Sequence, residues 1–251
     1  MTVIITMAGA GSRFTNVGYG CPKYQIKANG ISLFEWSLKS LEKFKKQKFI
    51  FACLYNINIE WLRAEIFKCG IKNFDVKIRK TISSGQAETA YDVIKDLDMN
   101  EKSETLWIFN IDTYIQDGMS PSDILENDGY IYVSNSTNPN MSYVKHDKNN
   151  YVTDLAEKKI ISNLATVGMY GFKSLSMFVK LYEEAYIKKN VECIAGEQYI
   201  LPMYSIALKY NMLILSHKLQ NEKVIVLGTP EELLKFDARA TPQHNLNYLE
   251  K

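Results

Sequence analysis

The sequence predicts an α/β fold built on a doubly wound, mixed but largely parallel sheet, with a smaller β-rich part in its second half. Over residues 1–128, short apolar runs rich in β-branched residues alternate with segments of helical spacing, as is typical of parallel sheets covered by helices. A small-residue loop ends the first run, and Asp112 ends a later one. Both are candidate site positions, because ligands bind at the carboxyl ends of such strands.

The first half is predicted to be a series of alternating strands and helices. Strands are expected at residues 3–5, 49–54, 74–79 and 105–111, and helices at 33–44, 58–69 and 86–97. Ser32 and Glu35 form a capping box at the start of the first helix. Gly70 ends the second helix.

The second half changes to short strands after residue 129. Strands are expected at 130–134, 142–145 and 151–155, helices at 175–188 and 198–210, and a strand at 224–227. Thr229 and Glu232 form a second capping box around Pro230, which opens a last helix. Without an obvious linker, residues 1–251 are expected to form one domain with the halves 1–128 and 129–251.

The bulk composition argues against several classes of partner. Thirty basic and 28 acidic residues leave a formal net charge of +2, so no overall field favours nucleic acid or an anionic membrane. The sequence lacks the stretch of about 18 apolar residues that a membrane span needs. The four cysteines are widely separated, which favours a reducing compartment, and with no signal segment the expected location is cytoplasmic. The oligomeric state is left open.

The first candidate element is the loop Ala8-Gly9-Ala10-Gly11-Ser12-Arg13, with Lys23 ten residues after the arginine. Glycines let backbone N–H groups approach a phosphate, and the two cations can neutralise a triphosphate. A tight βα turn with ordinary solvated cations is the alternative interpretation. The loop lacks the Gly-Lys-Ser/Thr of a Walker A loop and the third glycine of the dinucleotide fingerprint, so both of those loops are excluded.

Five elements in one order make the chain resemble the nucleotidyltransferases that include the sugar-1-phosphate nucleotidylyltransferases of capsule and surface polysaccharide synthesis. In chain order they are Gly9-Ala10-Gly11-Ser12-Arg13 with Pro22-Lys23, Ser84-Gly85-Gln86-Ala87-Glu88-Thr89-Ala90, Phe109-Asn110-Ile111-Asp112, Ala156-Glu157-Lys158, and Gly168-Met169-Tyr170-Gly171-Phe172. The resemblance spans nearly the whole chain. It implies a Rossmann-like fold of the nucleotide-diphospho-sugar transferase type, with an NTP-binding half at 1–128 and an acceptor-binding half at 129–251.

The resemblance also implies a role for each matched residue. Expected to be catalytic are Arg13, Lys23 and Lys158; to bind the nucleotide, Ala8, Gly9, Ala10, Gly11, Ser12, Arg13, Gly85 and Gln86; and to bind the acceptor, Glu157, Lys158, Gly168 and Glu197. Asp112 would hold Mg²⁺, a hard cation that prefers carboxylate oxygen. Considered alone, Asp112 is also typical of a turn, and Glu157-Lys158-Lys159 of a solvated surface run.

One position departs from the family pattern. Many members have a second metal-binding aspartate two residues before a late glycine, and here Val226 stands there, before Gly228. Glu197 is a candidate substitute ligand, although a helix-start carboxylate favoured by the helix dipole is an equally good account. A site with one carboxylate, completed by substrate phosphates, is the other alternative.

The expected substrates are an NTP and a small phosphate monoester. The acceptor is a sugar-1-phosphate or a non-sugar phosphate such as phosphocholine, glycerol phosphate or phosphoglutamine, and CTP is the favoured donor. One alternative is a nucleotide-sugar-dependent glycosyltransferase, although Asp112-Thr113-Tyr114 lacks the second carboxylate of a D-x-D motif. The other alternative is a non-catalytic nucleotide-binding protein of the same fold. Pyrophosphate release separates the leading hypothesis from both.

Overall fold

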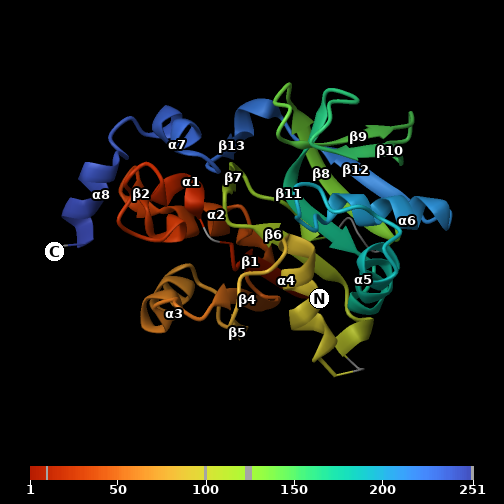
Figure 1. Ribbon diagram of the computed structural model, residues 1–251, viewed down its shortest axis with the longest axis horizontal. Helices are drawn as coiled ribbons and strands as arrows, with labels where there is room; N and C mark the ends of the chain where they lie inside the picture. The colour runs from red at the N-terminus through yellow and green to blue at the C-terminus, as the bar shows by residue number, and fades with distance from the viewer. Residues whose placement is uncertain (10, 99–100, 122–125, 250–251) are drawn as a thin grey trace.

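The computed structural model describes residues 1–9, 11–98, 101–121 and 126–249 (Figure 1). The main strands are β1 (Thr2–Met7), β4 (Lys48–Leu54), β5 (Phe74–Arg79), β6 (Leu106–Asn110), β8 (Gly129–Asn135), β9 (Ser142–His146), β10 (Val152–Glu157), β11 (Leu164–Phe172) and β12 (Ile214–Lys218). Two short strand pairs are β2 (Lys27–Ala28) with β3 (Ile31–Ser32), and β7 (Thr113–Ile115) with β13 (Val224–Val226). The α-helices are α1 (Ser12–Thr15), α2 (Leu33–Lys39), α3 (Ile59–Lys68), α4 (Gln86–Lys95), α5 (Leu175–Tyr182), α6 (Tyr204–Lys209), α7 (Pro230–Phe236) and α8 (Pro242–Leu249).

One nine-stranded sheet runs through both halves of the described chain. Its order is β10-β9-β11-β6-β1-β4-β5, and β8 pairs with both β11 and β12. β1 is parallel to β4 and β6, whereas β11 is antiparallel to β6 and to β8. β1, β4 and β6 therefore end at the same edge of the sheet, called the carboxyl edge below. The predicted doubly wound α/β fold is confirmed.

Helices cover both faces of the sheet (Figure 1). On one face, Phe34 of α2 and Ile66 of α3 share a core cluster with Val3 of β1. On the other face, Ala90 of α4 shares a second cluster with Ile4 of β1. β1 is thus buried on both sides, which explains why its sequence is a continuous apolar run rather than an alternating one.

A third core cluster joins the loop after β1 to the C-terminal helices. Phe14 and Tyr19 pack there with Leu227 and Leu233. The Tyr19 hydroxyl also donates a hydrogen bond to the Ala240 carbonyl oxygen (2.5 Å). In Figure 1, α7 and α8 accordingly lie beside α1 and β2. The last part of the chain therefore supports one of its first loops.

Several elements differ from the sequence-based prediction, which includes neither β7 nor β12. β11 is a nine-residue strand in which every residue is buried. No strand is predicted there, because Gly168 and Gly171 interrupt the run of residues that favour strands. The helix predicted at 198–210 is wrong in its first turn, because residues 198–200 are not helical and a 3₁₀ turn (Leu201–Met203) precedes α6. The cause is Gln198, whose main chain is hydrogen-bonded to the loop before α4.

No helix within the described ranges is long and apolar enough to cross a membrane.

Candidate active site

The Gly-rich loop lies at the carboxyl end of β1, next to the end of β6. Gly11 caps the single turn of α1, in which Phe14 is buried while Ser12 and Arg13 are exposed. Phe14 belongs to the third core cluster, so it anchors the turn and leaves the two polar side chains toward solvent. Of the other predicted loop residues, Ala8 is buried, Gly9 is exposed, and Ala10 lies outside the described residues.

An ion pair joins two predicted site residues that are 89 positions apart in the chain. Lys23 Nζ lies 3.0 Å from Asp112 Oδ2, with the side chains 16% and 30% exposed. Lys23 begins a 3₁₀ turn after Pro22, and its Nζ is 5.6 Å from the centroid of the Phe14 ring. The pair therefore lies beside the Gly-rich loop, and a ligand can still reach both charges.

The short strand pair β7–β13 holds Asp112 in place. The Asp112 carbonyl oxygen accepts a hydrogen bond from the Leu227 N–H (2.7 Å), and Val226 is paired with Thr113. A Cβ built on Gly228 would lie 3.5 Å from Asp112 Oδ2, so the late glycine lies against this carboxylate. Val226 thus occupies a strand position beside Asp112 and brings no carboxylate to it.

A metal ion at this position would have one carboxylate ligand from the residues that are brought together here. Within the described ranges, no group of three or more His, Cys, Asp or Glu side chains could hold a metal ion. Asp112 is paired with Lys23 through Oδ2. Because Mg²⁺ is commonly bound by one or two carboxylates plus substrate phosphates, this donor set fits a cation whose other ligands come from substrate and water.

The loop before α4 lies against the segment around Gln198. The Gln198 N–H donates to the Ser84 carbonyl oxygen (2.6 Å), and the Ala87 N–H donates to the Gln198 carbonyl oxygen (3.1 Å). Gly85 has a φ of 143°, and a Cβ there would lie 2.5 Å from the Gln198 carbonyl oxygen. A glycine is therefore required at position 85 by its neighbour as well as by its backbone conformation.

Gln86 begins α4, and its amide is partly engaged. Gln86 Nε2 donates to Thr6 Oγ1 (3.1 Å), and Thr6 Oγ1 donates to the Phe109 carbonyl oxygen (3.4 Å). Since the one hydroxyl hydrogen of Thr6 is used on that carbonyl, the amide must turn its nitrogen toward Thr6. Gln86 therefore offers its oxygen and one N–H to a ligand.

Glu157 ends β10 and is largely enclosed. Its Oε2 accepts a hydrogen bond from Ser142 Oγ (2.6 Å). Burial raises the pKa of the Glu157 carboxyl, an effect that Ser142 and the charge of Lys158 oppose and that Glu197 reinforces. The Glu157 carboxyl is thus a largely buried hydrogen-bond acceptor. Such a group suits a hydrogen-bond donor on a polar substrate.

Lys158 follows directly and makes close contact with Tyr199. Lys158 Nζ donates a hydrogen bond to the Tyr199 hydroxyl and lies 4.7 Å from the centroid of its ring. Burial raises the pKa of Tyr199, and the hydrogen bond and charge of Glu197 raise it further, while Arg13 lowers it. Lys158 is thus joined to Tyr199, and the neighbouring Gln198 joins this segment to the loop before α4.

Sequence reasoning missed Tyr199 as a member of this group. The available signal was its place two residues after Glu197, in a stretch singled out for its carboxylate alone.

Gly168 lies in β11 at the end of β6, with a φ of 82°. A Cβ on this residue would lie 2.2 Å from Asn110 Oδ1 and 2.3 Å from Asn110 Nδ2. The space that the missing side chain leaves is therefore filled by the Asn110 amide. Asn110 Oδ1 is itself buried without a hydrogen-bond partner among the described residues. Asn110 stands in one of the matched motifs, but sequence reasoning gave it no role.

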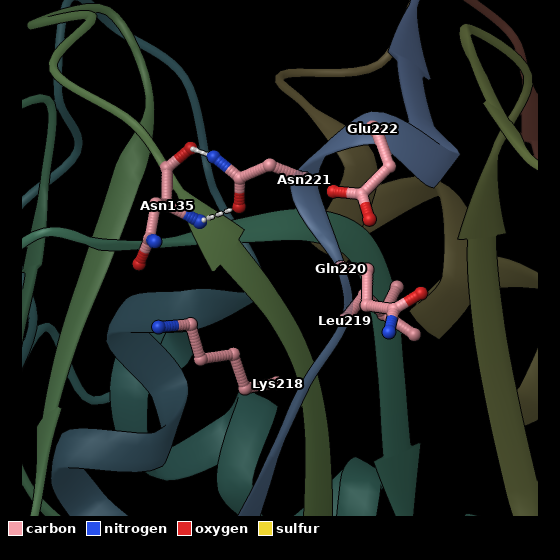
Figure 2. Close-up of a pocket in the computed structure, with 6 residues that line it drawn as sticks. All are labelled: Asn135, Lys218, Leu219, Gln220, Asn221 and Glu222. Carbon is pink, nitrogen blue, oxygen red and sulfur yellow. Dashed lines mark hydrogen bonds between the residues drawn. The ribbon is translucent and has the colours of Figure 1, made fainter.

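A surface hollow lies elsewhere, where β8 and β12 end, and Figure 2 shows its lining. The Asn135 N–H donates to Asn221 Oδ1 (2.8 Å), and Asn221 Nδ2 donates to the Asn135 carbonyl oxygen (3.0 Å). The other lining residues are Lys218, Leu219, Gln220 and Glu222. This lining includes no predicted site residue.

Solved structures similar to this chain include a nucleoside-diphosphate-sugar pyrophosphorylase from Vibrio cholerae RC9. It is 31% identical, with a TM-score of 0.85 over 94% of this chain and 99% of that chain. An inositol-1-phosphate CTP transferase from T. maritima is 17% identical, with a TM-score of 0.70 over 92% and 90% of the two chains. A CTP:phosphocholine cytidylyltransferase from Streptococcus pneumoniae is 16% identical, with a TM-score of 0.69 over 94% and 97%. The last two show a shared fold.

No protein-family model and no curated protein sequence matches the chain.

Proposed function

We propose, from the premise that this chain belongs to the nucleotidyltransferase family, that it transfers the nucleoside monophosphate of an NTP to a small phosphate monoester and releases pyrophosphate. The observation that supports the proposal is that Lys23 lies beside the Gly-rich loop, whereas Lys158 is bonded to Tyr199. The neighbour of Tyr199, Gln198, is hydrogen-bonded to the loop before α4. Such an arrangement suits two phosphorylated substrates.

In this reaction an oxygen of the acceptor phosphate attacks the α-phosphorus of the NTP. The new O–P bond forms as the bond from the α-phosphorus to the oxygen bridging the β-phosphorus breaks, and pyrophosphate leaves. A phosphate monoester has a second pKa of about 6, so the nucleophile is mostly an anion at neutral pH and needs no general base.

Catalysis then consists of holding two anions together and stabilising the charge that develops. Arg13 and Lys23 would neutralise the triphosphate, and Lys158 would hold the acceptor phosphate. Asp112 would hold Mg²⁺, whose charge neutralises phosphate oxygens when it is bound. In this assignment residues 1–128 bind the NTP and 129–251 bind the acceptor.

As substrates we propose CTP with a sugar-1-phosphate or a non-sugar phosphate such as phosphocholine or phosphoglutamine. The 31% identical structure is named for nucleoside-diphosphate sugars, and the two more distant ones are named for CTP with inositol-1-phosphate or phosphocholine. We assign the product to surface polysaccharide precursor synthesis in the cytoplasm. All four cysteines are described and unpaired, which supports a reducing compartment.

The test is a coupled pyrophosphate-release assay on the purified chain with Mg²⁺. CTP, UTP, dTTP, ATP and GTP are crossed with sugar-1-phosphates and non-sugar phosphates, and Asp112→Ala is the control for contaminating activity. Release that needs one NTP and one acceptor, and that Asp112→Ala loses, is the expected result. Nucleotide-sugar cleavage without NTP turnover would indicate a glycosyltransferase instead. NTP binding without release across the panel would favour the non-catalytic alternative.

A further inference from the structure

The backbone at Lys158 fixes where its side chain leaves the sheet. Lys158 follows β10 with a φ of 50°, a conformation uncommon for residues other than glycine. Its backbone N–H donates to the Met141 carbonyl oxygen (3.1 Å). A free lysine side chain would still sample many rotamers from this anchor, so a second contact is needed to direct the ammonium group.

Tyr199 supplies that contact through its hydroxyl. The Lys158 ammonium donates to the Tyr199 hydroxyl, and its nitrogen lies 4.7 Å from the centroid of the ring. An ammonium group can only donate, so the oxygen of the Tyr199 hydroxyl is the acceptor of this bond. Two of the three ammonium hydrogens stay available for a phosphate.

The main chain around Tyr199 is itself held by two other segments. The Tyr186 hydroxyl donates to the Tyr199 carbonyl oxygen (2.6 Å). The preceding residue, Gln198, donates its N–H to the Ser84 carbonyl oxygen (2.6 Å) and packs on Gly85. The main chain at Tyr199 is therefore held by Tyr186 and by the loop before α4, and the Tyr199 hydroxyl in turn contacts Lys158.

We propose that Tyr199 is a positioning residue that holds the Lys158 ammonium group ready for the acceptor phosphate. The inference rests on the proposed function, because it takes Lys158 as the phosphate ligand. A side chain ordered in advance loses less freedom when the ligand binds. Removing the hydroxyl therefore weakens phosphate binding by about tenfold, the range expected for a hydrogen bond to a charged group.

The experiment is a double-mutant cycle on the full chain with Tyr199→Phe, Lys158→Met and both together. Isothermal titration calorimetry gives the Kd of glucose 1-phosphate and of phosphocholine, each with Mg²⁺ and the α,β-methylene analogue of CTP. Tyr199→Phe keeps the ring, and Lys158→Met keeps the length of the side chain. Tyr210→Phe is the matched control, because Tyr210 is 58% exposed on α6's C-terminal side.

If Tyr199 acts through Lys158, Tyr199→Phe raises the Kd of a bound probe about tenfold in the wild-type background. In the Lys158→Met background the same substitution raises it less than about twofold. The inference would be overturned if Tyr199→Phe lowered the affinity equally in both backgrounds or in neither. It would also be overturned if the wild-type chain bound neither probe. The pyrophosphate assay distinguishes the two proposals. If the two substitutions are coupled but no pyrophosphate is released, the positioning role is upheld and the proposed reaction is rejected. If pyrophosphate is released but the losses of affinity are additive, the reaction is upheld and the positioning role is rejected.

Discussion

Replacing Gly168 with alanine tests how β6 and β11 share space at the carboxyl edge. The added Cβ would lie 2.2 Å from Asn110 Oδ1 and 2.3 Å from Asn110 Nδ2, on a backbone with a φ of 82°. A left-handed conformation costs an L-residue about 1–2 kcal/mol, and overpacking a filled site adds about 1–3 kcal/mol. We expect Gly168→Ala to lower the free energy of unfolding by about 2–5 kcal/mol.

Urea unfolding followed by circular dichroism measures this loss, with Asn110→Ala as the second variant. Removing the Asn110 side chain in the Gly168→Ala background should recover the stability lost through overpacking. The stability lost through the left-handed backbone conformation should remain lost. A Gly168→Ala chain within about 0.5 kcal/mol of wild type, or no recovery in the double variant, would refute the packing argument. A fully stable variant that loses only acceptor binding would instead favour close approach of the acceptor to Gly168.

Three further predictions concern the charged groups of the site. Lys23→Ala and Asp112→Ala should each reduce turnover by about 10²–10³ with an unchanged circular dichroism spectrum, and near-normal pyrophosphate release by either would contradict its role. Val226→Asp should lower the Mg²⁺ concentration that gives half-maximal activity, because it places a carboxylate on the strand position beside Asp112; an unchanged Mg²⁺ titration argues against a metal there. Burial raises the Glu157 pKa, so the native state binds the extra proton between that value and the ordinary one. The free energy of unfolding of wild type, relative to Glu157→Gln, should therefore rise as the pH falls through this window, and a pH-independent difference in urea unfolding would be inconsistent with it.

Local signals in the sequence predicted the first half of the fold well. Strand β5 begins and ends at the predicted residues, and the Ser32 hydroxyl accepts from the Glu35 N–H. This is one of the two bonds of the predicted capping box, and the Glu35 carboxylate accepts from Lys68. The strand pattern and the Ser32 cap depend on residues close in the chain. β11 was missed because its burial comes from three neighbouring strands, β6, β8 and β9, which no local pattern reveals.

The candidate site shows the same division. The Lys23–Asp112 contact follows from motif order and from strands that end at one edge. Tyr199 and Asn110 could not be found in this way, since each matters through a partner distant in the chain. Asn110 lies over Gly168, and Tyr199 reaches Lys158 from a segment expected to be helical. The motifs therefore included Asn110 without its contact to Gly168, and they did not include Tyr199.

The third core cluster also constrains when the site can form during synthesis. Phe14, which anchors the Gly-rich turn, belongs to a cluster that includes residues as late as Leu233 and Ala240, so this cluster is incomplete until almost the whole chain has left the ribosome. A nascent chain carrying only the first half would present this loop without its support. A chain that terminates before α7 would therefore contain the Gly-rich turn without the complete cluster in which Phe14 is buried.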